Sequence, residues 1–320
     1  ACFIGFFIYR QCRKRFYGEY QEVSTKNGHL HTNGTELHRF DSVDNDANEM
    51  VSVPLYSDGD GVEKKVTSFK DSNLSPVNIE TEDVAADSTL LKCPLKIQYS
   101  DTPQEHAISN RGGRVKIVPG NGTSSISGGP LGEAVFHLDH CVVLWGGDTD
   151  QRGSAHTVNG KPFAAEIHFV HWDKSAHTSF QEASKTPGGL AIIAAFIMVD
   201  GDHGNQLTQI CDNLRHISYK SQSWRISHFL TSTMLPEDTE HYWTYSGSLT
   251  SPPFTSDVTW IIFSQPISAS KIQMQEFQSL KHHEKDEGHV TGKQRKSEDR
   301  SSLKVQPLGS RIIRVPMRES

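Results

Sequence analysis

Residues 164–172 read AAEIHFVHW, and polar and apolar side chains alternate over residues 165–169. In a β-strand, successive side chains point to opposite faces of the sheet. The alternation therefore puts a carboxylate and an imidazole, those of Glu166 and His168, on one face, and the apolar Ile167 and Phe169 on the other. The run predicts a strand in which two titratable groups share one face.

Short segments of β-branched and aromatic residues recur between Gly, Pro, Asn and Ser breaks, which is typical of a strand-dominated domain. The predicted strands cover residues 94–99, 114–118, 134–144, 163–172, 190–199, 259–263 and 311–315. Apolar residues at helical spacing predict a helix over 207–217, and Ser270 with Gln273 forms a capping box that predicts a second one. The chain is therefore predicted to be mostly β, with a few short surface helices.

The composition excludes some classes of function. Hydrophobic residues make up 35% of the 320 residues and the formal net charge is -6, which fits a globular protein and gives no basic excess for binding nucleic acid. The 17 histidines favour metal or proton chemistry. The five cysteines form no CxxC pair and are too scattered for a disulfide scaffold.

The N-terminal part differs from the rest. Residues 1–9 are apolar and Arg10 begins a basic flank, as at the cytoplasmic end of a membrane helix, although nine residues cannot span a bilayer. We expect residues 1–15 to be the end of a membrane segment in a fragment, and the alternative is that the apolar run is a short buried or interfacial segment. Residues 16–62 are expected to be a disordered polar linker, and residues 63–320 to form the domain. A cytoplasmic or membrane-associated location is favoured over secretion.

Several short strings carry a family pattern. They are SPVNI at 75–79, GGPL at 128–131, WG at 145–146, GSAHTV at 153–158, AAEIHFVHW at 164–172 and YWTYSGSLTSPP at 242–253. Their order and spacing are similar to those of alpha-class carbonic anhydrases over residues 63–320. The resemblance implies a large, twisted, mainly antiparallel sheet with a few short surface helices and an active cavity on one face.

The resemblance also implies zinc chemistry, in which a zinc-bound hydroxide held by three histidines hydrates carbon dioxide. His168 matches the third zinc ligand of the family. Glu166 and His156 match residues that support the ligands through hydrogen bonds.

The other two ligand positions are lost. In the family, a Phe-His-Phe-His-Trp-Gly pattern supplies both histidines, and counting back from Trp145 those places hold Val142 and Leu144. Neither side chain can bind zinc, so we expect zinc to be absent or weakly bound. The resemblance is therefore to a ligand-deficient, carbonic anhydrase-related member.

One alternative set of ligands remains open. The string FHLDH at 136–140 is similar to the family's Phe-His-Leu-His with Asp139 inserted. By simple alternation His140 shares the cavity face with Val142 and Leu144, whereas His137 does not. A β-bulge at Asp139 would bring both imidazoles onto that face and make them candidate metal ligands.

Other family positions are altered or kept. Ala155 replaces a glutamate that orients the threonine matching Thr250, which in turn orients the zinc hydroxide. Gly113 stands where the family carries its histidine proton shuttle. The apolar residues that match the carbon dioxide pocket are Val170, Ile192, Leu249 and Trp260.

Two functions remain open. The first is a carbonic anhydrase-like domain without hydration activity that acts as a binding or scaffold module for an unknown protein partner. The alternative is an active zinc lyase that converts carbon dioxide and water to bicarbonate and a proton. The alternative requires that residues 132–144 supply ligands through a bulge, or that this part of the sequence contains a gene-model error.

Overall fold

The computed structural model describes residues 73–120, 123–147, 153–200, 206–251, 253–286 and 304–317. The predicted membrane segment (1–15) and the linker (16–62) lie outside these ranges. Among the described residues, no helix is both long enough and apolar enough to cross a bilayer.

The fold is mostly β, as the sequence predicts. The strands are β1 (Asn78–Ile79), β2 (Ala85–Ala86), β3 (Lys96–Gln98), β4 (Gln104–Asn110), β5 (Arg114–Pro119), β6 (Ser125–Ser127), β7 (Phe136–Trp145), β8 (Thr157–Val158), β9 (Ala165–Asp173), β10 (Leu190–Val199), β11 (Ser223–Phe229), β12 (Tyr242–Ser248), β13 (Ser256–Phe263), β14 (Ile267–Ala269) and β15 (Arg314–Val315). The helices are α2 (Thr89–Lys92), α3 (Phe180–Ala183), α4 (Thr208–Leu214) and α5 (Lys271–Ser279), and three 3-10 turns cover Gly129–Leu131, Arg215–Ile217 and Thr231–Met234.

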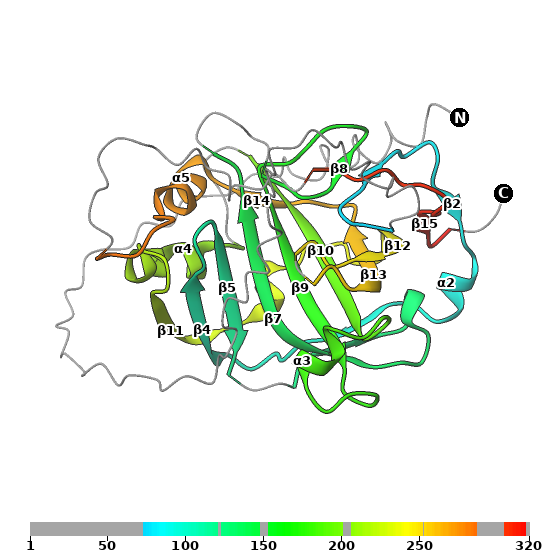
Figure 1. Cartoon of the computed structure of the whole chain (residues 1–320), viewed down its shortest axis with the longest axis horizontal. Helices are drawn as coiled ribbons and strands as arrows, with labels where there is room; N and C mark the ends of the chain where they lie inside the picture. Colours follow the sequence, from blue (N-terminus) through cyan, green and yellow to red (C-terminus); the bar gives the residue numbers. More distant parts are fainter. Residues whose placement is uncertain are drawn as a thin grey trace, which may run out of the picture. The chain divides into compact units, whose positions relative to one another are not determined.

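One sheet of 13 strands organises the domain, in the order β11-β4-β5-β7-β9-β10-β13-β12-β15-β2, with β14, β3 and β6 attached to it (Figure 1). Strands β4, β5, β7, β9 and β10 are antiparallel neighbours, whereas β10 pairs in parallel with β13 and β14. The parallel pairs make the sheet mixed. This is consistent with the prediction of a mainly, but not purely, antiparallel sheet. A separate two-stranded sheet joins β1 and β8.

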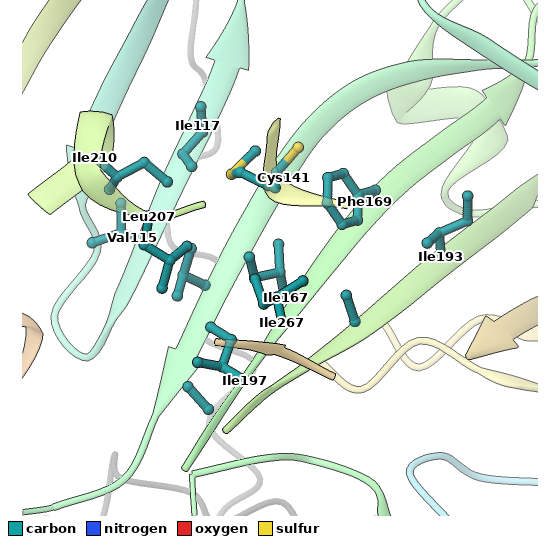
Figure 2. Packing of buried hydrophobic residues seen from close by; sticks show 14 of the residues in the cluster. Val115, Ile117, Cys141, Ile167, Phe169, Ile193, Ile197, Leu207, Ile210 and Ile267 are labelled. Carbon is teal, nitrogen blue, oxygen red and sulfur yellow. The ribbon is translucent and has the colours of Figure 1, made fainter. Parts of the chain in front are cut away.

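The main core covers one face of this sheet. Figure 2 shows apolar side chains from β5, β7 and β9 on this face, with Leu207 and Ile210 at the beginning of α4. Helix α5 adds Met274 and Phe277 to the same core. Its capping box forms as predicted, because the Ser270 hydroxyl accepts from the Gln273 backbone N–H and the Gln273 side chain accepts from the Ser270 N–H.

The opposite face carries the candidate site. Val115, Ile117, Ile167 and Phe169 are fully buried in the core, so their neighbours along β5 and β9 point the other way. This alternation places Glu166, His168 and Val170 on the second face, together with the side chains that lie opposite them on β7 and β10. We call this second face of β5, β7, β9 and β10 the site face.

Candidate functional site

The pairing of β7 with β9 decides which side chains meet on the site face. Val142 lies directly opposite His168, and Leu144 lies directly opposite Glu166. Directly opposite residues on antiparallel strands project to the same face, with Cβ atoms about 4.5–5.5 Å apart. The structure therefore places both apolar residues beside the two titratable ones, at the positions where the family resemblance expects histidines.

A buried carboxylate is the centre of the hydrogen bonds on this face. Glu166 is 0% exposed, and its Oε1 accepts from His156 Nδ1 at 2.8 Å and from His168 Nε2 at 2.7 Å. Its Oε2 accepts from the backbone N–H of His156 at 2.9 Å. Three donors therefore compensate for the removal of this carboxylate from water.

The network continues away from the carboxylate. His156 Nε2 lies 2.7 Å from the Tyr245 hydroxyl, which lies 2.7 Å from the hydroxyl of Ser75. Because a carboxylate only accepts, His156 carries its proton on Nδ1, and Tyr245 then donates to Nε2. By the same logic, His168 carries its proton on Nε2, so its Nδ1 is left as an acceptor on the side of the ring away from Glu166.

The pKa shifts agree with these roles. Burial would raise the pKa of Glu166, but the charges and hydrogen bonds of His156 and His168 lower it well below its ordinary value, so the group is ionised. Burial lowers the pKa of His168, against the opposing effect of Glu166, and the positive charge of Arg114 lowers it further. His168 is therefore a neutral imidazole near neutral pH.

One group of described residues has the composition of a metal site. The possible ligand atoms of His156, Glu166 and His168 lie within 4.8 Å of one another, and all three residues are buried. These same atoms, however, already bond to one another at 2.7 and 2.8 Å with a proton between each pair. A metal would have to displace both protons before it could bind there.

The sheet contains a β-bulge at Asp139. His140 pairs with Val170 and His137 pairs with Trp172, so the register shifts by one residue between them. The shift places His137 and His140 on the same face of β7, which is the site face. The backbone therefore has the bulge that His137 and His140 would need in order to serve as the alternative set of metal ligands.

The imidazoles of His137 and His140 do not meet His168, however. The His140 Nδ1 lies 2.6 Å from Asp139 Oδ2, and its ring contacts Phe180 edge-on. The Nδ1 of His137 is buried without a hydrogen-bond partner. Neither residue belongs to the group of described residues whose ligand atoms lie within 4.8 Å of His168.

The structure also describes the predicted site residues Ala155, Thr250 and Gly113. Ala155 is 3% exposed and Thr250 is 8% exposed, and the Thr250 hydroxyl makes no hydrogen bond within the described part of the chain. Gly113 lies in the turn between β4 and β5 with φ of 115°. A histidine at Gly113 would be strained at this φ, because L side chains rarely adopt it.

The predicted apolar pocket residues form one row. Val170 on β9 lies opposite Ile192 on β10, and Ile192 lies opposite Trp260 on β13. All three are buried in a second apolar cluster, and Leu249 packs against it. The Trp260 ring also lies edge-on to His168, with 5.0 Å between the ring centroids.

Four residues on or next to the site face were not predicted from the sequence. Ser75 and Tyr245 belong to the quoted strings SPVNI and YWTYSGSLTSPP, but their contact joins residues 170 positions apart, which no local pattern indicates. Arg114 lies opposite Leu144 and Lys116 lies opposite Val142. Alternation along β5 was the signal that could have placed these two basic side chains on the site face.

Comparison with known proteins gives a consistent result. The family model described as "Eukaryotic-type carbonic anhydrase" matches residues 61–316. The chain is 36% identical over 252 residues to the human "Carbonic anhydrase-related protein", an alignment that covers 77% of this chain and 85% of the relative. It is also 36% identical over 209 residues to "Carbonic anhydrase 1" of Monodelphis domestica, with 65% of this chain and 78% of the relative covered. "Carbonic anhydrase 7" of Mus musculus is 36% identical over 208 residues, with 64% and 76% covered.

Proposed function

Since this chain belongs to the eukaryotic-type carbonic anhydrase family, we propose that it keeps the family fold, lacks carbon dioxide hydration activity, and acts as a binding module. The observation that carries the proposal is the pairing of Val142 with His168 and of Leu144 with Glu166. The positions that could complete a metal shell around His168 carry only hydrocarbon.

The residues present do not fit a catalytic zinc ion. Such a site needs three protein ligands and one open position for water or substrate. On the site face, His168 offers Nδ1, and the two neighbouring positions on β7 offer no donor atom. One imidazole gives neither the affinity nor the tetrahedral geometry of a catalytic site. No step of the proposed function therefore involves zinc.

The intact hydrogen-bond network does not argue for catalysis. Glu166, His156 and Tyr245 satisfy one another in the interior, where an unpaired polar group would be costly. Their retention is explained by folding alone, because loss of any member leaves a buried donor or acceptor unsatisfied. The same holds for the apolar row of Val170, Ile192 and Trp260, which fills the second cluster.

An active zinc lyase remains the second candidate, and the bulge at Asp139 is the observation in its favour. The bulge brings His137 and His140 to the site face, although their ring nitrogens do not gather around His168. A metal could bind there only after both side chains, and the Asp139–His140 hydrogen bond, had rearranged.

Stopped-flow measurement of carbon dioxide hydration separates the two candidates. We expect the purified chain to leave the uncatalysed rate unchanged, both as isolated and after incubation with zinc, while an active carbonic anhydrase in the same buffer accelerates it. Zinc-dependent hydration by this chain would contradict the proposal. In that case His137→Ala and His140→Ala should each abolish the activity if the bulge supplies the ligands.

A further inference from the structure

We propose that a cavity between residues 78–83 and residues 306–313 binds an arginine side chain of a partner protein. The inference rests on the proposed binding role and gives the partner a chemistry. None of the residues that line this cavity belongs to the candidate site described above.

The cavity combines a polar and an apolar lining, and its volume is about 300 Å³. The polar part comes from Asn78, Glu80, Asp83 and Gln306. The rest is the hydrocarbon of Pro307, Leu308 and Ile313. Small-molecule sites in proteins have volumes of about 300–1,000 Å³, so this cavity suits a single side chain better than a large ligand.

Backbone hydrogen bonds hold the two walls of the cavity together. The Gln306 N–H donates to the Pro76 carbonyl at 2.7 Å, and the Ala85 N–H donates to the Ile313 carbonyl at 2.9 Å. Strand β15, which follows Ile313, pairs with β2 (Figure 1). Ile313 itself is 4% exposed and belongs to the second apolar cluster. The cavity is therefore built into the folded domain.

A β-turn brings the two carboxylates of the cavity together. The Asp83 N–H donates to the Glu80 carbonyl at 3.0 Å, and a turn of this kind keeps the Cα atoms of its ends within about 7 Å. The backbone N–H and the hydroxyl of Thr81 donate to Asn159 Oδ1 at 2.9 and 3.2 Å, which fixes the turn on the domain. Both acidic residues are exposed, so a ligand can reach them without opening the fold.

Neither carboxylate is neutralised by a cation of the described residues. Glu80 Oε1 accepts from Asn78 Nδ2 at 2.5 Å, and that donor is an uncharged amide. The carboxylate of Asp83 makes no hydrogen bond or ion pair within the described part of the chain. The cavity therefore presents two negative charges beside hydrocarbon.

The arginines of the C-terminal wall are engaged elsewhere. The guanidinium of Arg311 donates to three backbone carbonyls, and Arg314 forms an ion pair with Asp87 at 2.9 Å. Since these cations have other partners, the cavity keeps a negative potential that attracts a cation from outside.

A guanidinium matches this lining better than an ammonium does. The Gln306 Nε2 donates to the Lys304 carbonyl at 2.6 Å, so the amide oxygen of Gln306 remains an acceptor beside the carboxylates of Glu80 and Asp83. A guanidinium carries five N–H donors in one plane and can serve several acceptors at once, whereas an ammonium is a compact, strongly hydrated charge. The methylene groups of an arginine can pack on Pro307 and Leu308 while its charged end stays near the surface.

The test is a titration of the full chain with the peptide acetyl-glycyl-arginyl-glycine amide at low ionic strength, followed by amide NMR. The same peptide with lysine or with citrulline, an uncharged analogue of arginine, in the central position gives the comparison. We expect saturable shifts centred on residues 78–83 and 306–313 with the arginine peptide, weaker binding of the lysine peptide, and no saturation with the citrulline peptide.

Variants of the acidic residues locate the binding. Asp83→Asn and Glu80→Gln should each weaken binding of the arginine peptide by about threefold or more, because each removes one charge-assisted contact. The matched control is Asp212→Asn, which changes an exposed aspartate on α4, far from β2 and β15 (Figure 1). This control should bind like the unaltered chain. Circular dichroism checks that each variant folds, and the three peptides on the unaltered chain decide the question if one does not.

Several outcomes would overturn the proposal. They are the absence of saturable shifts with the arginine peptide, equal affinity for the arginine peptide and either of the other two, and equal affinity in Asp83→Asn, Glu80→Gln and Asp212→Asn. Shifts of the same amides with protein concentration alone would also overturn it, because a second copy of the chain would then fill the cavity. Carbon dioxide hydration measured on the same samples keeps the two proposals separate, since an inactive chain that binds no peptide would leave the proposed loss of zinc chemistry intact.

Discussion

Replacing Val142 and Leu144 together with histidine is expected to give a protein that binds one zinc ion per chain. The register places residue 142 directly opposite His168, and residue 144 lies on the same face of β7, so three imidazoles would converge from two adjacent strands. His168 already holds its proton on the nitrogen that faces Glu166, which leaves Nδ1 available to the metal. Competition with a chelator should give a dissociation constant below about 1 μM, or about 8 kcal/mol of binding free energy.

Single replacements are the controls for this variant. Val142→His alone and Leu144→His alone each leave two imidazoles, so each should bind zinc far more weakly than the double variant. If the double variant folds and takes up no zinc, the alignment of β7 with the family's ligand strand is wrong. Adding Arg114→Gln to the double variant should strengthen zinc binding further, because it removes a positive charge from the neighbouring strand position.

Hydration activity should then depend on residue 155. In the double histidine variant we expect weak hydration of carbon dioxide, and adding Ala155→Glu should raise it by about tenfold or more, because the carboxylate would orient the Thr250 hydroxyl towards the bound hydroxide. Ala155→Glu alone should give no activity and should lower stability, since residue 155 is only 3% exposed and the carboxylate would be buried without a partner. Equal rates with and without the glutamate would refute the role given to Thr250.

The second large effect is expected at the buried carboxylate. Glu166→Gln should lower the free energy of unfolding by about 3–5 kcal/mol, because an amide cannot accept from His156 Nδ1, His168 Nε2 and a backbone N–H together. The measurement is urea denaturation at neutral pH. The control is Glu105→Gln, which alters an exposed ion pair with Arg225 and should cost about 1 kcal/mol or less.

The pH dependence gives this prediction a second readout. The pKa of His171 is lowered to about 3, mainly by burial, and that of His168 is also lowered from 6.5. The unfolded chain takes up protons near pH 6.5 while these folded imidazoles do not, so the stability they contribute is lost as the pH falls below about 6.5. Glu166 has a lowered pKa, so its contribution is present above about pH 4.5 and is lost only at lower pH. The lower stage should be smaller in Glu166→Gln, where the lowered pKa values of Asp87 and Asp173 still contribute to it, and an unchanged acid profile in that variant would contradict the assignment.

Much of the fold could be predicted because its signals are local. Alternation in residues 164–172 predicted β9 and the faces of its side chains, and the Ser270–Gln273 pair predicted the beginning of α5. Strands β4, β11 and β12 were not predicted as elements. Polar and small residues interrupt the apolar pattern of these three strands, and their place in the sheet depends on pairing with distant strands.

The residues of the candidate site could be predicted from the sequence, but the contacts among them could not. The order of the family strings placed Val142, Leu144 and His168 without coordinates. The sequence could not decide whether a β-bulge forms at Asp139. An inserted residue turns every side chain on one side of it to the opposite face of the sheet, and this depends on the pairing with β9. The positions of Arg114 and Lys116 opposite Leu144 and Val142 depend on the register between β5 and β7. Side-chain packing in the folded sheet determines that register.

The most direct test of the loss of zinc chemistry is the metal content of the unaltered protein. The full chain is equilibrated with excess zinc and dialysed against metal-free buffer near neutral pH. Its zinc content is then measured by inductively coupled plasma mass spectrometry. We expect zinc far below one ion per chain, because the positions beside His168 and Glu166 are those of Val142 and Leu144. One tightly held zinc ion per chain, released by His168→Ala, would contradict it.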